Sequence, residues 1–253
     1  MIGSDERIED LQYNGLKIIQ KTTGYRFTTD AVLLANFVKG AKGKKVADVG
    51  CGSGIIAILV AEKQQPKYVL GIEIQQEVAQ MAERSVALNN LTDKIEIKNA
   101  DVRALSIEMG EVFDVVVVNP PYRKVGSGLT QRQDTLCMSR HEVTLTLEEV
   151  FASAKRLLKF GGSMFMVHQA ERMAEAFALG HKYGLEAKEL CPVCARQGSN
   201  PNVFLARFVK GGKVGLKWLE PIVVFDADGN YSVTVKKLYG DSFLSTDGQK
   251  EKK

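Results

Sequence analysis

The chain has 253 residues, of which 45% are hydrophobic and 25% charged, enough apolar material for a sizeable core. No apolar run approaches the roughly 20 residues that a membrane-spanning helix needs. The polar, acidic start MIGSDERIED is unlike a signal peptide. We therefore expect a cytoplasmic protein with no membrane segment. The formal net charge of +4 is too small to indicate a partner by itself.

Charge is distributed unevenly along the chain. Residues 47–120 hold 11 acidic and 6 basic side chains, whereas residues 151–217 hold 4 acidic and 11 basic ones. A basic region beside an acidic one suits a polyanionic partner. An ordinary solvated surface whose charges are spread unevenly along the sequence gives the same pattern.

Strand and helix patterns alternate along most of the chain. This alternation predicts an α/β fold, with a doubly wound, seven-stranded, mostly parallel sheet and helices on both faces. The last two strands lack a helix between them and predict an antiparallel hairpin at the sheet edge. In chain order we expect a strand over 17–20, a helix over 28–38, a strand over 44–50, a helix over 55–63, a strand over 68–73, a helix over 76–90, strands over 95–97 and 113–118, a helix over 147–158 ended by Gly161 and Gly162, a strand over 163–168, a helix over 171–183, and strands over 185–190 and 202–209.

The first glycine turn, DVGCGSG, follows a strand and opens a helix. In doubly wound sheets a ligand binds at the carboxyl ends of the strands, where the strand order reverses. The dinucleotide fingerprint G-x-G-x-x-G fails here, because Ile55 stands third after Gly52. The carboxylate of Asp48, just before Gly50, would repel a pyrophosphate. It suits a ligand that carries an amine or a sulfonium, such as S-adenosylmethionine.

Two further carboxylates follow the next strands. Glu73 ends the second strand of the sheet and can accept from both ribose hydroxyls, as the acidic residue of dinucleotide sites does. Asp101 follows the third strand and can accept from an adenine amino group, with Ile74 and Val102 on either side of the ring. Each carboxylate alone is compatible with a surface charge or a helix cap. The three in order indicate a nucleoside cofactor.

The fourth strand of the sheet runs into a polar, rigid segment, VVVVNPPYRK. Asn119 offers an amide and Pro120 a carbonyl held in a fixed direction, so two acceptors can bind the hydrogens of a planar amino group. Tyr122, after Pro121, can stack on the ring that carries this group. A base inside a duplex must be flipped out to reach such a pocket, whereas an RNA loop offers unstacked bases.

With these motifs, the sequence resembles class I S-adenosylmethionine-dependent methyltransferases of the NPPY type. More closely, it resembles bacterial tRNA (adenine-N(6))-methyltransferases that act beside the anticodon of a valine tRNA. GYRFTTDAVLLANFV (24–38), NPPYRK with the later SRHE (139–142), and GLKWLEPIVVFDADGNYS (215–232) carry the resemblance, which covers about residues 8–239.

The resemblance implies a cofactor site at the strand ends and a target-base clamp beside it. We expect residues 1–45 to pack on the cofactor site, residues 46–239 to form the methyltransferase domain, and residues 240–253 to be a disordered tail. The implied cofactor residues are Thr29, Asp30, Asp48, Gly50, Gly52, Glu73, Ile74, Asp101, Val102 and Asn119, and the clamp is Asn119, Pro120, Pro121 and Tyr122.

Basic residues provide candidate contacts to tRNA phosphates, although any one of them can equally be a solvated surface charge. We expect a monomer that needs no metal. The candidates are Arg123, Lys124, Arg132, Arg196, Lys210, Lys213 and Lys217.

Other chemistries remain open. Glutamine-amide protein methyltransferases, which also present a planar NH₂, usually carry a long N-terminal helical domain, and about 45 residues precede the glycine turn here. Methylation of ribosomal RNA or DNA shares the clamp, and a non-catalytic binding module would share the fold. The pair Cys191 and Cys194 could be half a zinc site or a redox pair. Without further ligands, two reduced thiols at a strand end are favoured. His168, in an apolar strand, is expected to be structural.

Overall fold

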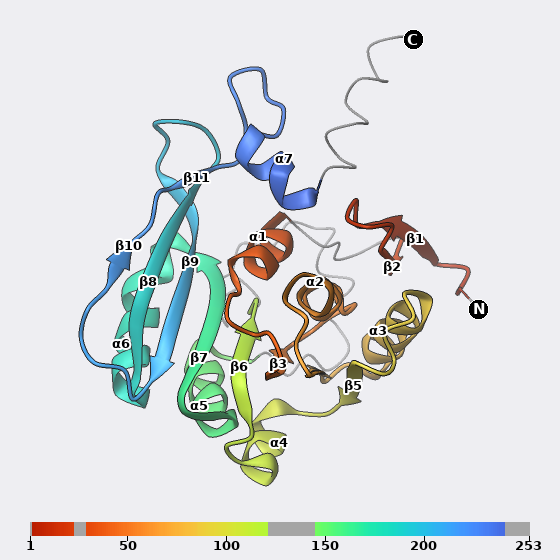
Figure 1. The fold of residues 1–253 in the computed structure, drawn as a ribbon, viewed down its shortest axis with the longest axis horizontal. Helices are drawn as coiled ribbons and strands as arrows, with labels where there is room; N and C mark the ends of the chain where they lie inside the picture. Colours follow the sequence, from red (N-terminus) through yellow and green to blue (C-terminus); the bar gives the residue numbers. More distant parts are fainter. Residues whose placement is uncertain (1, 23–28, 121–144, 241–253) are drawn as a thin grey trace, which may run out of the picture.

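The computed structural model describes residues 2–22, 29–120 and 145–240. Within these residues, a nine-stranded sheet has the order β10-β8-β9-β7-β6-β3-β4-β5, with β11 also paired to β8, and a two-stranded sheet is formed by β1 and β2 (Figure 1). The strands are β1 (Glu6–Asp10), β2 (Lys17–Lys21), β3 (Lys45–Val49), β4 (Tyr68–Glu73), β5 (Ile95–Asn99), β6 (Phe113–Val118), β7 (Leu158–Gln169), β8 (Leu185–Cys194), β9 (Pro201–Lys210), β10 (Lys217–Trp218) and β11 (Ile222–Val223).

Helices cover both faces of the large sheet. One buried cluster packs α1, α2 and part of α3 on one face, and a second packs α4, α5 and α6 on the other (Figure 1). The helices are α1 (Thr29–Phe37), α2 (Ile55–Gln64), α3 (Gln76–Leu88), α4 (Val102–Met109), α5 (Leu147–Leu157), α6 (Met173–Tyr183) and α7 (Val233–Tyr239), with a 3₁₀ turn at Ala170–Arg172. The expected α/β class is confirmed.

The strand directions define two edges of the large sheet. Strands β3 to β7 run parallel to one another, and the order reverses between β3 and its neighbour β6. We call the edge where these strands end the carboxyl edge, and the opposite one the amino edge. Strand β9 is antiparallel to both β7 and β8. The expected hairpin is therefore confirmed, and the short strands β10 and β11 extend the sheet beyond β8.

Two local sequence patterns explain why strand β6 and helix α5 form where they do. The buried strand β6 is a run of valines after Phe113, as a strand covered on both faces requires. Helix α5 begins with a capping box, in which the Thr146 hydroxyl accepts from the Glu149 N–H and the Glu149 carboxylate accepts from the Thr146 N–H. Its Leu147, Val150 and Phe151 side chains are buried at helical spacing.

The junction of α5 and β7 differs from the expectation. The predicted glycine stop at Gly161 and Gly162 is wrong, because α5 ends at Leu157 and the chain passes directly into β7. Gly161 has a φ of +77°, and a Cβ on Gly162 would lie 2.9 Å from the Lys159 carbonyl oxygen. The pairing of β6 with β7 shifts register at this place. The glycines therefore form an irregular start of a long strand rather than a helix end.

The N-terminal hairpin of β1 and β2 packs on α3. The Asn89 side chain donates to the Lys17 carbonyl and accepts from the Lys17 N–H, at 2.7 and 2.8 Å. The Ser85 hydroxyl accepts from the Ile19 N–H at 3.0 Å. The Glu6 carboxylate receives two bonds from the Arg84 guanidinium, which lower the pKa of Glu6 to about 2. The division of the chain at residue 45 stays a prediction, and the tail 241–253 lies outside the described residues.

The paired cysteines lie at the end of β8. Cys191 and Cys194 are buried, free thiols in the last four residues of the strand. Cys191 Sγ lies 3.3 Å from the Glu220 carbonyl oxygen. Within the described part of the chain, no three potential ligands gather to hold a metal ion, and no helix is long and apolar enough to cross a membrane.

We expect Phe208→Ala to lower the free energy of unfolding by about 3–5 kcal/mol, as truncation of a buried phenylalanine does. The Phe208 side chain is fully buried and makes edge contacts with the rings of Phe151 and Phe177, at centroid distances of 5.2 and 5.7 Å. Urea denaturation measures the change. The matched control is Phe160→Ala at an 80% exposed site, which should change the value by less than about 0.5 kcal/mol. Equal losses in both variants would contradict the packing described here.

Candidate active site

The glycine turn after β3 lies at the carboxyl edge. Its backbone is anchored to β4, since the N–H groups of Gly50 and Cys51 donate to the Ile72 carbonyl at 2.9 and 3.0 Å. Gly50 and Gly52 have φ values of +68° and +55°, and a Cβ added to either would meet nothing within 4 Å. Positive φ selects glycine at both positions. The open space beside them allows a ligand to approach the backbone.

Glu73 joins this turn to the next one. Its side chain accepts from the Gly52 N–H and from the Gln75 N–H, both at 3.0 Å. Glu73 as a whole is 7% exposed, and each carboxylate oxygen keeps a second acceptor position. This geometry holds an anionic acceptor at the end of β4, where the sequence places a partner for ribose hydroxyls.

Asp48 lies beneath the same turn. One carboxyl oxygen, Oδ2, accepts from the Ala57 N–H in the first turn of α2 at 3.0 Å, whereas Oδ1 is buried without a hydrogen-bond partner in the described structure. Burial raises the pKa of Asp48 to about 7, the Ala57 N–H opposes this rise, and the charge of Glu73 adds to it. A carboxyl group whose pKa lies near neutral pH, and of which one oxygen lacks a hydrogen-bond partner, is typical of a functional site.

Asp101 follows β5 and caps α4. Its side chain accepts from the Arg103 N–H at 2.9 Å and pairs with the Arg103 guanidinium, which lowers the pKa of Asp101. Arg103 also reaches Glu149 at 3.1 Å and so ties α4 to α5. The sequence did not single out Arg103. An acceptor role of Asp101 toward an adenine amine stays a prediction, and it would use the lone pairs that Arg103 leaves.

Apolar and amide groups complete this part of the edge. Ile74 is 41% exposed after the end of β4, and Val102 is buried at the start of α4. The Asn99 amide donates to the carbonyls of Glu73 and Ile74, both at 2.9 Å. Asn99 therefore positions the backbone that carries two of the expected cofactor residues. The sequence analysis did not single out Asn99, although its place at the end of a strand is a signal that could have identified it.

Asn119 and Pro120 follow the last residue of β6. Val118 pairs with Val49, the last residue of β3, so Asn119 leaves the sheet beside the glycine turn. Asn119 is half-buried and Pro120 buried. The expected partners Pro121, Tyr122, Arg123, Lys124 and Arg132, and the SRHE segment, lie outside the described residues.

The start of α1 lies near the same edge. Thr29 is the first residue of the helix, and its hydroxyl lies 3.0 Å from the hydroxyl of Tyr231. Asp30 follows in the first turn. Their expected contact with a cofactor stays a prediction.

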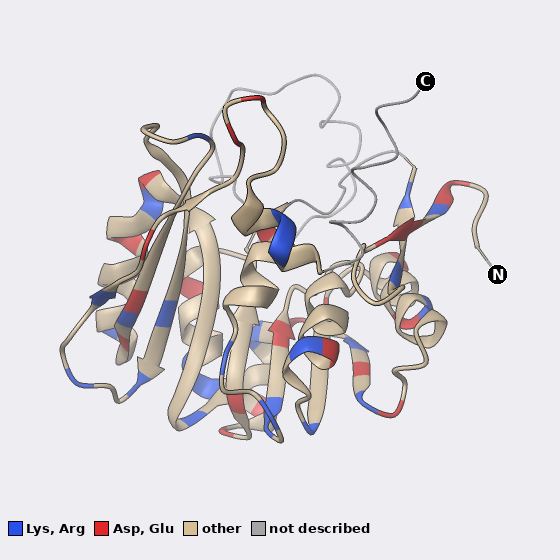
Figure 2. Cartoon of the chain, turned by 45° about the horizontal axis from the view of Figure 1, so that its top comes forward, with Lys and Arg blue, Asp and Glu red and all other residues tan. Residues whose placement is uncertain are grey.

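The structure does not bring the later basic candidates together. Arg196 is exposed in the loop between β8 and β9, at the carboxyl edge. Lys210 ends β9 at the amino edge, and Lys213 follows it in the chain. Lys217, in β10, lies opposite Glu189 in the strand pairing with β8, halfway along that strand. Lys and Arg residues accordingly lie on several faces, the amino-edge loops among them (Figure 2).

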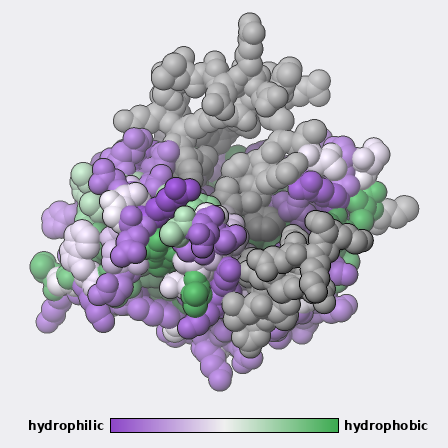
Figure 3. Space-filling model, turned by 90° about the horizontal axis from the view of Figure 1, so that it is seen from above, coloured by the Kyte–Doolittle hydropathy of each residue, from purple (hydrophilic) through white to green (hydrophobic). Residues whose placement is uncertain are grey.

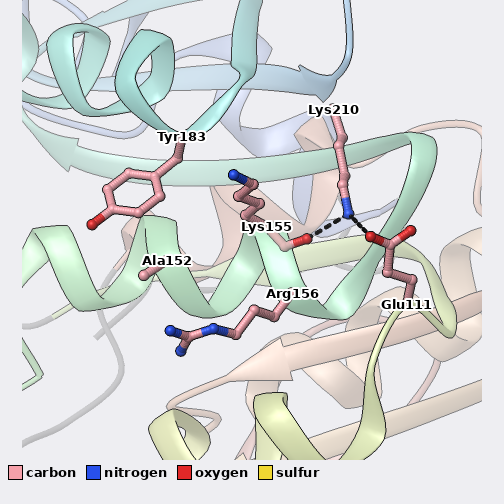
Figure 4. A pocket seen from close by; sticks show the side chains of 6 residues that line it. All are labelled: Glu111, Ala152, Lys155, Arg156, Tyr183 and Lys210. Carbon is pink, nitrogen blue, oxygen red and sulfur yellow. Dashed lines mark hydrogen bonds and ion pairs between the residues drawn. The ribbon is translucent and has the colours of Figure 1, made fainter.

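Lys210 is held by the protein itself. Its ammonium group donates to Glu111 at 2.6 Å and to the Lys155 carbonyl at 2.7 Å (Figure 4). It also donates to the Leu158 carbonyl at 2.7 Å. It lines a cavity of about 240 Å³ together with Glu111, Ala152, Lys155, Arg156 and Tyr183. This cavity lies at the amino edge, at the opposite end of the sheet from the glycine turn. Lys210 therefore has a structural role that explains its position.

His168 is buried near the end of β7, as the apolar strand predicts. Burial lowers its pKa to about 4, and the charge of Arg172 acts in the same direction. The ring is therefore neutral at physiological pH.

The sequence model of the methyltransferase small domain family matches residues 27–185, more than half of the chain. The chain belongs to this family. The expected resemblance to methyltransferases is thereby confirmed, and the glycine turn, Glu73 and Asn119 all lie inside the matched residues.

Named relatives of this methyltransferase cover most of its length. A Porphyromonas gingivalis protein named tRNA1(Val) (adenine(37)-N6)-methyltransferase is 28% identical over 85% of this chain and 87% of its own. A protein of the same name from Bacteroides thetaiotaomicron is 27% identical over 85% and 89%. One from Histophilus somni is 23% identical over 94% and 98%.

Solved structures share the fold of this methyltransferase. A protein described as a predicted O-methyltransferase from Agrobacterium tumefaciens has a TM-score of 0.66 at 24% identity, over 83% of this chain and 95% of the other. Methanocaldococcus jannaschii Trm5, solved in complex with adenosine, has a TM-score of 0.60 at 17% identity, over 83% of this chain and 58% of its own. At these identities the likeness shows the fold alone.

We expect the buried Asp48 carboxyl to make stability depend on pH. Its pKa of about 7 lies above the unfolded value of about 3.9, so the folded state binds the extra proton between these values. Its contribution is fully present below about pH 4 and is lost as the pH rises through 7, a change on the order of 4 kcal/mol. Asp48→Asn keeps an acceptor for Ala57 and should remove this slope.

Urea denaturation from pH 4 to 8 measures the difference between wild type and Asp48→Asn. Asp93→Asn, at an exposed site, is the matched control and should follow the wild-type profile. If wild type and Asp48→Asn have parallel profiles, Asp48 does not bind the extra proton when folded.

Proposed function

We propose that this chain is an S-adenosylmethionine-dependent methyltransferase that methylates the exocyclic amino group of an adenine in the anticodon loop of a valine tRNA. The placement of Asn119 and Pro120 beside the glycine turn carries this proposal, because it sets two acceptors for a planar NH₂ next to a nucleoside cradle. The names of the relatives support the choice of tRNA and adenine. Such an enzyme would work in the cytoplasm.

The residues at the carboxyl edge fit the proposed cofactor. Glu73 offers acceptors for ribose hydroxyls, and the exposed Ile74 offers an apolar face for the adenine ring. The turn at Gly50 and Gly52 leaves room beside the backbone for the methionine part, with the unsatisfied Asp48 oxygen beneath it. These groups carry no positive charge and suit a cofactor without phosphate. When bound, S-adenosylmethionine supplies a methyl group activated by its sulfonium.

Positioning is the main task of the protein in this reaction. An exocyclic amine is a weak nucleophile, since its lone pair is delocalised into the ring. Acceptance of its two hydrogens by the Asn119 side-chain oxygen and the Pro120 carbonyl favours a more tetrahedral nitrogen and aims its lone pair. Fixed orientation can lower a barrier by about 7–11 kcal/mol. In the transfer, the new N–C bond would form as the methyl–sulfur bond breaks, leaving a neutral thioether, and the nitrogen would lose one proton to water. His168 is fully buried in β7 and is not required for this step.

The carboxyl edge would also face the tRNA. Seen from this edge, the described surface is mostly hydrophilic, with scattered hydrophobic groups (Figure 3). Arg196 is exposed at this edge, whereas Lys213 is exposed at the other. We therefore assign a phosphate contact to Arg196 ahead of Lys210, Lys213 and Lys217.

Asn119→Ala should lower the rate of methyl transfer to unmodified tRNA by at least about 100-fold, the size of effect seen when a positioned catalytic donor or acceptor is removed. Label from methyl-labelled S-adenosylmethionine, followed into digested nucleosides by mass spectrometry, measures it. Gln80→Ala, at an exposed amide side chain on α3, is the control and should retain the wild-type rate. Label in ribosomal RNA or a glutamine amide, with none in tRNA, would overturn the substrate and keep the chemistry.

Arg196→Ala should weaken tRNA binding several-fold and lower the slope of log affinity against log salt by about one, as expected for one lost phosphate contact. Filter binding at several salt concentrations gives both numbers. Lys213→Ala removes a lysine from the amino edge and should leave both unchanged. A larger effect of Lys213→Ala would mean that tRNA lies along the other end of the sheet.

A further inference from the structure

Three aromatic rings from the C-terminal segment (residues 217–240) stack beside the start of α1. The Tyr231 ring is parallel to Phe225, with centroids 5.5 Å apart and an interplanar angle of 8°, and it stacks on Tyr239 at 5.7 Å and 27°. Phe225 and Tyr231 also form a backbone bridge. Tyr239 is buried, which raises the pKa of its hydroxyl, and a hydrogen bond with Tyr231 adds to the rise.

The rest of the segment holds this stack in a fixed place. Strand β11 pairs in parallel with the end of β8, and the Phe225 N–H donates to the Ala195 carbonyl at 2.9 Å. The Ser232 hydroxyl accepts from the Val235 N–H, which caps α7, and donates to the Val223 carbonyl at 2.7 Å. The stack is therefore anchored to the end of β8 at the carboxyl edge.

Helix α1 runs from this edge down across the sheet. Its last residue, Phe37, lies edge-on to Phe165 of β7 at 5.8 Å, and Lys39 pairs with Glu189 in the middle of β8 at 2.5 Å. The first turn of α1 therefore lies closer to the end of β8 than its last turn does. That turn meets the Tyr231 hydroxyl, 3.0 Å from the Thr29 hydroxyl.

We infer that Tyr231 is a positioning residue for the cofactor site, whose hydroxyl holds Thr29 and the first turn of α1 where they can contact the methionine end of the cofactor. The ring stack fixes Tyr231, and Tyr231 fixes Thr29. The Thr29 hydroxyl also forms a hydrogen bond with Tyr239. Because a threonine hydroxyl has one donor and two acceptor positions, one of the three is left for a ligand. This inference rests on the proposed function, because it takes S-adenosylmethionine as the ligand.

Tyr231→Phe tests it, since this change removes one hydroxyl and keeps the stack. Titration calorimetry with S-adenosylhomocysteine, which cannot react, should show affinity about three- to tenfold weaker, as for one lost hydrogen bond. Thr29→Val should weaken binding similarly, and the double variant should be no weaker than the worse single one. The maximal methylation rate at saturating cofactor should stay within about twofold of wild type.

Tyr183→Phe is the matched control, because its hydroxyl contacts Glu148 at 3.0 Å on the exposed face of α6, away from the glycine turn. It should bind S-adenosylhomocysteine as wild type does. If Tyr231→Phe lowers the melting temperature and leaves the affinity at the wild-type value, the tyrosine is merely structural and the inference is overturned. Wild-type protein that binds no S-adenosylhomocysteine would overturn the proposed function as well.

Discussion

The carboxylate of Glu73 is the contact on which the site depends, because it joins the first two strand–helix turns. It accepts from the Gly52 N–H and from the Gln75 N–H, so the glycine turn and the start of α3 share one anion. Donors that would otherwise face the ligand are thereby satisfied within the protein. The acceptor positions that remain on Glu73 are those that we propose for the ribose hydroxyls of the cofactor.

Asp48 illustrates the energetic cost of a polar group in the core. A carboxyl with 0% exposure and one unsatisfied oxygen destabilises the fold, and the single Ala57 bond offsets only part of the desolvation. Hydrophobic packing of α1 and α2 on the same face of the sheet supplies the stability that tolerates this group. Destabilisation of this kind is characteristic of functional sites, where a group is positioned for a ligand at the expense of the stability of the ligand-free protein.

Strands with long apolar runs could be predicted from the sequence almost to the residue. Strands β4 and β6 have the expected bounds, since burial on both faces leaves a clear pattern. Helices α4 and α7 are short and were missed, because each is specified by a capping residue and by tertiary packing rather than by periodicity. The basic candidates Arg196 and Lys210 looked alike in sequence, and strand direction alone places them at opposite edges. Likewise, no local pattern pairs Thr29 with Tyr231, which are 202 positions apart.

The docking of α7 has a consequence for biosynthesis. Lys63 of α2 lies over the Tyr13 ring at 3.5 Å and donates to the Leu238 carbonyl at 2.8 Å, so the N-terminal hairpin, α2 and α7 meet at one cation. During translation, the hairpin and α2 leave the ribosome long before α7 is made. The nascent chain can assemble its parallel sheet, yet this junction closes only after nearly the whole chain has emerged. Chains released before α7 would therefore have a complete sheet, with Lys63 and the Tyr13 ring left without their partner from α7.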